Sequence, residues 1–538
     1  MSDPRHSTPG SRSLVRPVCF LTVTVVQGSE AFMGLYDFTF YDLIVRNAVS
    51  YPIRPAWYEA DANKTLTFLQ VKEMVDGLAC GLLATGIKPG DRIGVLGKNS
   101  LEYFLLYGAA AALGAILLPV NWRLSSEEIE YNLKDCEPKV LFVDAEYQDF
   151  AESVKDRLPF IKNYYTLNSG NGNFQAFGTL TNNPGIFEAP DVSTDNSLVI
   201  IHTAAVQGRP RGAVLTQGNL LCAGLHLNHC FHLNESDVHL NFLPLFHVGG
   251  LFMAVSSYMA GALNINMSKF DAQRSVELIE TKKATIFFDF SPILAAILDE
   301  HEKTGRDIKS IRAVMGLDTP ETIEKYQRVT GGTFYTIYGQ TETTGLATMG
   351  KYNDRPGSAG MVVPLGDVRL VDDYDRPVPV GQVGEITMKG PLVFKGYWNL
   401  PVDTAHTFRE GRHHTGDMGR FDEDGFLWYA GRKAEKELIK PGGENVYPVE
   451  VEKAILKHPA VEKVVVFGVP DPKWKEGIKA VCRLKSGTHL DAQELIRFVG
   501  EQIASYKKPQ YVEFISDFPF LEDGSPDRAK IKELYGGT

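Results

Sequence analysis

Short apolar runs alternate with longer amphipathic stretches through the first part of the chain. Apolar residues recur at helical spacing over 65–84, and the compact apolar run 92–96 that follows is typical of a buried strand. The small, apolar stretch 102–118 predicts a buried helix that runs into the next strand, and 139–144 predicts a further strand. This alternation predicts an α/β fold, with a large layered N-terminal domain whose sheets are covered by helices.

Turn and capping signals separate these elements. The sequence KPGD at 88–91 predicts a turn before the strand at 92–96. In SSEE at 125–128 a serine is followed three residues later by a glutamate, the capping box that begins a helix, here predicted over 127–133. Residues 169–185 show no periodicity, so we predict a plain loop there.

A second pattern follows residue 452. The apolar runs 463–469 and 478–484 predict two strands, and Asp491 followed by Glu494 predicts the start of a helix. These elements predict a small α+β C-terminal domain. The predicted domain boundaries are 1–33 for an extension that is disordered or precedes the native start, 34–435 for the large domain and 436–538 for the small domain.

Composition excludes several classes of function. The formal net charge of −11 argues against a nucleic-acid surface, which needs a basic patch to displace counterions. The six cysteines are scattered without a CxxC pair, as expected of free thiols in a reducing, cytoplasmic compartment rather than of a disulfide framework or a zinc site. No apolar run reaches the ~18 residues that a membrane helix needs, so we predict no membrane span. The oligomeric state is left open.

The stretch GRKAEKELIKPGGENVYPVEVE at 431–452 joins the two predicted domains. Its charged run and paired glycines resist a single regular element, because glycine and proline interrupt backbone order. In order and content it resembles the hinge of the adenylate-forming superfamily, in its acyl-CoA synthetase branch (AMP-dependent synthetases and ligases). The resemblance extends from about residue 35 to the C-terminus, with further motifs in the expected order. It implies that the small domain is mobile.

The resemblance implies a site for an adenine nucleotide. YGQTE at 338–342 would place an aromatic ring beside adenine and oxygens beside the α-phosphate and Mg²⁺, which prefers oxygen ligands. HTGD at 414–417 would bind the ribose. The implied nucleotide-binding residues are Gly316, Tyr338, Gly339, Thr341, Asp417 and Arg432, with Glu342 as the Mg²⁺ ligand and His247, Glu342 and Lys440 as catalytic residues.

The phosphate loop departs from the family pattern. The family has a hydroxyl-rich loop that ends in Gly-x-Pro-Lys-Gly and wraps the ATP phosphates through its backbone. Here its centre is AAVQ at 204–207, which lacks three hydroxyls and a glycine, and each lost hydrogen bond to a phosphate is worth roughly 1.5–3 kcal/mol. We therefore predict weak triphosphate binding. The residues that keep the pattern or its charge are Thr203, Gly208, Arg209, Arg211 and Gly212.

The family's adenylation lysine is also replaced. It follows a glycine near the C-terminus, and Ser525 occupies that position here. The lysine bridges carboxylate and phosphate as negative charge builds, a role worth ~10²–10³-fold in rate. Serine cannot supply that charge, and Lys530 is too far along the chain to replace it without a rebuilt loop.

The thiol-binding parts match the family. Gly442, Gly443 and Glu444 correspond to the loop that lines the pantetheine channel in thioester-forming members, and Lys436 or Glu437 corresponds to the pivot of the hinge. Both departures affect adenylation, while the adenylate and CoA sites are retained.

The sequence thus predicts an acyl-CoA ligase that forms a thioester from an acyl-adenylate and CoA, with adenylation weak or lost. Its ligands would be AMP or ATP, CoA, Mg²⁺ and a carboxylic acid or its adenylate, with a separate adenylating enzyme as a possible partner. The apolar segment around His247 suggests a fatty, terpenoid or aromatic acyl group. Two alternatives stay open: a complete ATP-dependent acyl-CoA synthetase, and a non-catalytic protein that binds acyl or nucleotide ligands.

Overall fold

The computed structural model describes the chain from Asp37 onward, with short gaps. The predicted phosphate-loop residues Gly208 and Arg209, the hinge residues Lys436 and Glu437, and Ser525 lie outside the described residues, as does the extension 1–33. The described ranges are 37–167, 174–182, 187–203, 210–372, 374–433, 439–444, 446–516, 518–521 and 526–537.

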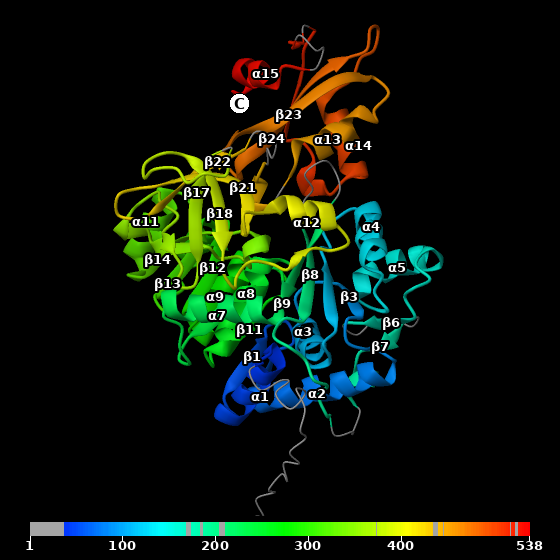
Figure 1. The fold of residues 1–538 in the computed structure, drawn as a ribbon, viewed down its shortest axis with the longest axis vertical. Helices are drawn as coiled ribbons and strands as arrows, with labels where there is room; N and C mark the ends of the chain where they lie inside the picture. The colour runs from blue at the N-terminus through cyan, green and yellow to red at the C-terminus, as the bar shows by residue number, and fades with distance from the viewer. Residues whose placement is uncertain are drawn as a thin grey trace, which may run out of the picture. The chain divides into compact units, whose positions relative to one another are not determined.

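The first sheet is built mainly from parallel strands in the order β19-β9-β8-β4-β3-β5-β6-β7 (Figure 1). Its central strands are continuous apolar runs because both of their faces are buried. The strands are β3 (Arg92–Leu96), β4 (Ile116–Val120), β5 (Val140–Val143), β6 (Asn163–Thr166), β7 (Gln175–Ala176), β8 (Ser197–Thr203), β9 (Arg211–Thr216) and β19 (Gly396–Tyr397).

Helices connect these strands much as the sequence predicts. Helix α2 (Phe68–Ala84) precedes β3, and α3 (Leu101–Leu113), apolar on all sides, is buried nearly throughout. Helix α4 (Ser126–Cys136) begins with the predicted capping box, in which Glu128 N donates to Ser125 Oγ and Ser125 N donates to the Glu128 carboxylate. The loop predicted over 169–185 is wrong in part, because its described residues form β7 and the short helix α6 (Gly178–Thr181), which buries Leu180 against α2.

The second sheet has the order β16-β15-β14-β13-β12-β10-β11-β1-β2. Helix α7 (Gln217–Cys230) leads into this sheet from β9 of the first one, and α8 (Val248–Met259), α9 (Ala272–Lys282), α10 (Ile293–Thr304) and α11 (Pro320–Thr330) connect its strands. Its strands are β1 (Pro55–Glu59), β2 (Lys64–Thr67), β10 (Val238–Asn241), β11 (Leu263–Asn266), β12 (Ile286–Phe290), β13 (Ala313–Leu317), β14 (Thr333–Tyr338), β15 (Thr348–Lys351) and β16 (Met361–Val362).

A third sheet is antiparallel and carries the chain toward the hinge. Its order is β17-β18-β21-β20, and β22 pairs with β21. The register places Asp417 opposite Arg432, next to an irregularity between Asp417 and Gly419. The strands are β17 (Asp367–Val371), β18 (Gly384–Lys389), β20 (Phe408–Arg409), β21 (Arg412–Phe421) and β22 (Leu427–Arg432).

The C-terminal part has its own sheet and its own apolar core. Strands β23 (Val461–Asp471) and β24 (Lys475–Leu484) form a long hairpin, and β25 (Tyr511–Phe514) pairs with β24 in parallel. Helices α13 (Pro448–Leu456) and α14 (Ala492–Gln502) pack on this sheet, and α15 (Arg528–Tyr535) contacts β23 (Figure 1). As predicted, Asp491 caps α14, because its carboxylate accepts hydrogen bonds from the backbone of Gln493 and Glu494.

The sheets and their connecting helices confirm the predicted α/β fold class, and the separate small sheet with its helices confirms the smaller α+β C-terminal part. Among the described helices none is both long and apolar enough to cross a membrane. The five cysteines in the described part of the chain carry free thiols.

Candidate functional site

The motif 338–342 lies where β14 ends, and its backbone is fixed by close packing. Tyr338 is the last residue of the strand, and Thr341–Thr343 form a single 3₁₀ turn. A Cβ atom at Gly339 would lie 2.2 Å from the carbonyl oxygen of Gly345, so a side chain there would displace the backbone. The glycine is therefore required by the turn that brings Tyr338 and Glu342 to the same place.

Asp417 is the centre of a buried polar network. Its carboxylate is 1% exposed, and Oδ2 accepts hydrogen bonds from the Tyr338 hydroxyl at 2.8 Å and from Gln340 Nε2 at 2.5 Å. Arg432 Nε lies 2.8 Å from Asp417 Oδ1, across the β21–β22 ladder. These three predicted nucleotide-binding residues, Tyr338, Asp417 and Arg432, are thus brought together.

Tyr338 and Arg432 both keep their protons in this network. Burial, and then the Asp417 carboxylate, raise the pKa of the Tyr338 hydroxyl far above its usual value, so the phenol stays a donor. Burial alone would lower the pKa of Arg432, but Asp417 together with the nearby Tyr447 and Tyr429 more than offsets burial, so the guanidinium stays charged. A carboxylate that is surrounded by donors in this way fits the hydroxyl groups of a ribose, which could exchange with Gln340 or Tyr338.

Glu342 lies a short distance away and faces Arg211. Its carboxylate is 8% exposed, and Oε1 accepts a hydrogen bond from the Tyr397 hydroxyl at 2.8 Å. The Arg211 guanidinium carbon lies 4.1 Å from the centre of the Tyr397 ring. A single hard carboxylate beside an arginine fits Mg²⁺, which takes oxygen ligands and completes its shell with water and phosphate oxygens. Glu342 would hold the ion, which would neutralise phosphate charge.

The stem of the phosphate loop is ordered on both sides. Strands β8 and β9 pair antiparallel, with His202 opposite Gly212 and Thr203 opposite Arg211. The Thr203 hydroxyl donates to the Arg211 carbonyl at 3.3 Å. A Cβ at Gly212 would lie 2.6 Å from Ile200 Cγ2, which explains the glycine by packing. The residues between the two strands, 204–209, lie outside the described residues.

The predicted acyl side is an aromatic cavity of about 310 Å³. His247 caps helix α8, where its Nδ1 accepts a hydrogen bond from Gly249 N at 3.1 Å. Burial lowers the pKa of His247, so the ring is neutral and its proton is on Nε2. The cavity is closed on its apolar side by Phe252, Phe288 and Phe290 and reaches Tyr338, Thr341 and Lys440 at its polar end.

Gly316, the last but one residue of β13, has a backbone conformation and packing that only glycine allows. It has φ of +153°, and a Cβ there would lie 1.9 Å from the Asp289 carbonyl oxygen. Strand β13 therefore approaches β12 without a side chain between them at this point. The prediction that Gly316 touches adenine stays a prediction.

The segment 439–444 reaches the same region from the C-terminal part. Lys440 lines the aromatic cavity, and burial, followed by repulsion from Arg432, lowers the pKa of its amine. Glu444 forms an ion pair with Arg123 and lines a small cavity with His247 and Thr341. Gly442 has φ of +57°, and its amide donates to the Trp474 carbonyl at 3.3 Å. Three functional candidates in this region, Arg123, Tyr397 and Gln340, are not singled out by the sequence analysis.

Comparisons with known proteins agree with this geometry. A profile of the AMP-binding enzyme family matches residues 44–398, and a profile of the AMP-binding enzyme C-terminal domain matches residues 450–523. Indoleacetate–CoA ligase from Aromatoleum aromaticum is 32% identical over 480 residues, covering 88% of this chain and 94% of that protein. Feruloyl-CoA synthase from Amycolatopsis is 32% identical over 502 residues, covering 90% of this chain and 99% of that protein.

A solved structure from Rhodopseudomonas palustris, assigned as a long-chain-fatty-acid CoA ligase, is also similar. It is 45% identical, covers 74% of this chain and 100% of its own, and superposes with a TM-score of 0.71. The similarity therefore covers sequence and fold together.

Proposed function

The chain belongs to the AMP-binding enzyme family and is an acyl-CoA ligase that uses an adenine nucleotide, CoA and Mg²⁺, and from this premise we propose that it works mainly on the thioester half of the reaction. In that half-reaction an acyl-adenylate and CoA become acyl-CoA and AMP. The first half, which makes the adenylate from a carboxylic acid and ATP, would be slow or absent in this chain.

The observation that carries this proposal is Ser525 at the position of the family's adenylation lysine. The lysine supplies positive charge to the transition state of adenylation, and a serine hydroxyl cannot. The stretch AAVQ at 204–207 in the phosphate loop, which lacks the family's hydroxyls, would weaken the same step through the β- and γ-phosphates, which only ATP carries. Both changes leave the acyl-adenylate and its reaction with a thiol untouched.

The geometry of the retained residues supports the thioester step. Asp417 and Arg432 would hold the ribose end of the adenylate, and Lys440 would lie beside the phosphate that departs. The CoA sulfur forms a bond to the acyl carbon, the bond from that carbon to the AMP oxygen breaks, and the thiol proton passes to solvent. His247, with its proton on Nε2, would donate to the acyl oxygen.

The walls of the cavity favour an apolar, aromatic acyl group. The Phe288 and Phe290 rings lie 4.7 Å apart by their centres, and Phe252 lies 5.6 Å from Phe288. Such a wall offers ring faces and edges to a flat apolar ligand. The relatives that act on indoleacetate and ferulate support the same class. We further propose that the enzyme works in the cytoplasm and receives its adenylate from a separate adenylating enzyme.

The deciding experiment compares two single-turnover reactions of the same enzyme. One supplies synthetic phenylacetyl-AMP with CoA, and the other supplies phenylacetate, ATP, Mg²⁺ and CoA. We expect acyl-CoA from the first and little from the second, with weak acid-dependent exchange between ATP and pyrophosphate. Rapid exchange with this acid would establish the complete synthetase instead.

A repair experiment tests the cause. Ser525→Lys alone should restore little exchange, because the phosphate loop is also altered. Combining it with hydroxyl residues at 204–207 should restore more than the sum of the two changes, because both act on one transition state. If Ser525→Lys alone restores full exchange, the phosphate loop is competent as it stands.

A further inference from the structure

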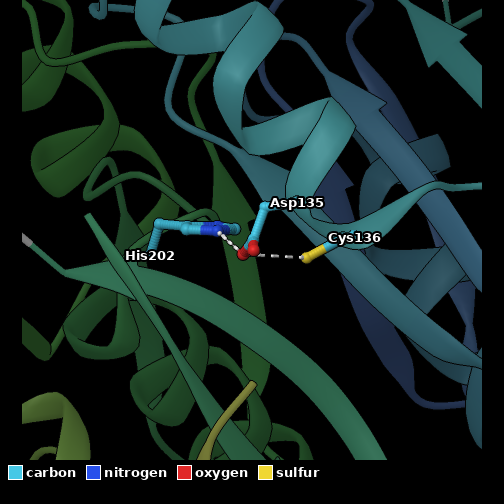
Figure 2. A group of neighbouring side chains, drawn as sticks. All are labelled: Asp135, Cys136 and His202. Carbon is cyan, nitrogen blue, oxygen red and sulfur yellow. Dashed lines mark hydrogen bonds and ion pairs between the residues drawn. The ribbon is translucent and has the colours of Figure 1, made fainter. Parts of the chain in front are cut away.

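Three potential metal ligands meet beside the stem of the phosphate loop (Figure 2). Asp135 and Cys136 are the last residues of α4, and His202 lies near the end of β8. His202 Nε2 lies 2.9 Å from Asp135 Oδ2, and Cys136 Sγ lies 3.9 Å from the same oxygen. One ligand atom from each residue lies within 4.8 Å of the other two.

The surroundings are enclosed and contain unmatched polar atoms. Cys136 has no exposed surface, and the side chain of His202 is 5% exposed. Asn132 lies one turn before Cys136 on α4, and its Oδ1 is buried without a hydrogen-bond partner among the described residues. Asn132 and His202 line the same cavity of about 60 Å³, which has room for a water molecule. A hydrogen-bonded His–Asp pair alone would leave this amide oxygen unmatched.

We propose that Asp135, Cys136 and His202 bind a divalent transition metal, with Zn²⁺ the best fit. Thiolate, imidazole and carboxylate are the three ligand types that zinc takes in proteins. A water molecule would complete a tetrahedral shell; of the three ligands, only His202 also lines the cavity beside Asn132. The inference does not rest on the proposed function, because none of the three ligands is among the residues assigned to the adenylate, although His202 lines the same cavity as His247 and Thr341.

The distances fit such a site after small movements. Zinc bonds of ~2.0 Å to nitrogen and oxygen and ~2.3 Å to sulfur place tetrahedral ligands roughly 3.3–3.6 Å apart. The observed separations of 2.9 Å and 3.9 Å lie on either side of that range. The Asp135 carbonyl accepts hydrogen bonds from Trp398 Nε1 at 3.1 Å and Asn399 Nδ2 at 3.2 Å, so the end of α4 is held in place. Binding would release the thiol proton to solvent.

Sequence spacing alone argues against this site. The absence of a CxxC pair made a zinc site unexpected, because that rule detects ligands contributed in pairs by one short segment. Here two ligands are adjacent in sequence and the third is 67 residues from Asp135. Only the fold brings them together, because α4 packs on β4 and β4 pairs with β8.

A metal at this position would anchor the phosphate loop. His202 is followed by Thr203, and the phosphate loop begins at the next residue. A metal held by His202 and by α4 would tie one side of that loop to α4. Tyr131, also on α4, donates from its hydroxyl to the Pro210 carbonyl at 3.4 Å, on the other side of the loop. Both ends of the loop would then be anchored to one helix.

The test uses the full chain, stripped with a chelator and titrated with Co²⁺ and then Zn²⁺. We expect one Co²⁺ per chain, with a thiolate-to-cobalt charge-transfer band in the near ultraviolet that Zn²⁺ abolishes. Cys136→Ser should remove the band and weaken binding by more than the ~10–100-fold typical of residues behind the ligands. Cys222→Ser is the matched control, since Cys222 Sγ also lies 3.4 Å from a histidine nitrogen, that of His226, but has no carboxylate beside it.

Two further results test the metal site even if the Cys136→Ser variant is unstable. His202→Gln should lower Co²⁺ affinity to a similar extent while keeping the Cys136 thiol. A chain that takes up no Co²⁺ beyond the Cys136→Ser level, or one that shows no thiolate band, overturns the proposal and leaves a His202–Asp135 ion pair only.

Discussion

Asp417 shows how one buried carboxylate organises the predicted nucleotide site. It joins strands β21 and β22 through Arg432 and receives donors from Tyr338 and Gln340, so it links the third sheet to the end of β14. Removing one partner of a buried ion pair is costly because the other charge stays without compensation.

Asp417→Asn should therefore lower both stability and nucleotide affinity. We expect unfolding free energy to fall by ~3–5 kcal/mol and AMP affinity to fall roughly 10–100-fold, measured by denaturant titration and by calorimetry. Asp422→Asn is the control, because Asp422 lies on the same hairpin but away from the network. Its carboxylate accepts a hydrogen bond from Trp428 and pairs with Arg355. Unchanged AMP affinity in Asp417→Asn would place the ribose elsewhere.

Glu59 makes stability depend on pH. Burial raises the pKa of its carboxyl group to about 7, partly offset by hydrogen bonds from Asn266 and Trp57. The folded protein therefore binds this proton more tightly than the unfolded chain, and stability falls as pH rises from about 4.5 through about 7. Glu59→Gln should remove that part of the slope and raise stability at pH 8 by on the order of 3 kcal/mol at most. Urea titrations at several pH values, with the exposed Glu73→Gln as control, measure it; an unchanged slope would contradict it.

At the scale of elements, local signals carry much of the fold. The capping boxes, the apolar runs of β3 and β5 and the cap of α14 depend on residues that are near neighbours in sequence, and the structure confirms them. Helix α6 is missed because its four residues are held by packing of Leu180 on α2, not by periodicity. For the same reason Tyr397 and Arg123 are missed: each acts through a partner far away in the chain.

The turn at Gly442 gives a prediction at this scale. A Cβ there would lie 2.8 Å from the Trp474 ring, and φ is positive, so any side chain must move the ring or the loop beside Glu444. Gly442→Val should lower the rate of thioester formation at least ~10-fold, by analogy with the loss that misplacement of a site causes. Binding of an acyl-AMP analogue should change little, because Asp417 and Tyr338, which would bind it, lie on β21 and β14.

Gly487→Val is the matched control, because Gly487 also has a positive φ but open space around it. Equal losses in both variants would mean that backbone strain alone, and not the contact with Trp474, is responsible. A Gly442→Val enzyme that reacts with CoA at the parent rate would place the thiol path elsewhere.

Across the whole molecule, Lys507 connects the two parts of the chain. It is 2% exposed and pairs with Glu128 at the start of α4 and with Glu450 on α13, at 2.6 Å for the latter. Burial opposes its charge, but the two carboxylates raise the pKa of its amine. One cation thus holds a helix of the large domain and a helix of the C-terminal part.

Lys507→Met should leave two carboxylates without their cation. We expect a loss of ~3–5 kcal/mol in unfolding free energy and a slower thioester step, while the affinity for AMP stays unchanged. Lys485→Met, on the exposed side of the same C-terminal part, should alter neither. Denaturation and single-turnover rates measure the two effects, and a Lys507→Met enzyme with a parental rate would show that this contact is not used in catalysis.

The pairing of Asp417 with Arg432 has a consequence for the timing of product release. Lys433 N donates to the Gly416 carbonyl at 3.1 Å, and the predicted pivot at Lys436 or Glu437 begins just beyond this last rung of the β21–β22 ladder. The residues that would hold the ribose therefore lie in the hairpin that precedes the predicted pivot in the sequence. We therefore propose that the departure of AMP, which would remove a ligand from Asp417, is linked to the rotation of the C-terminal part that the family resemblance implies.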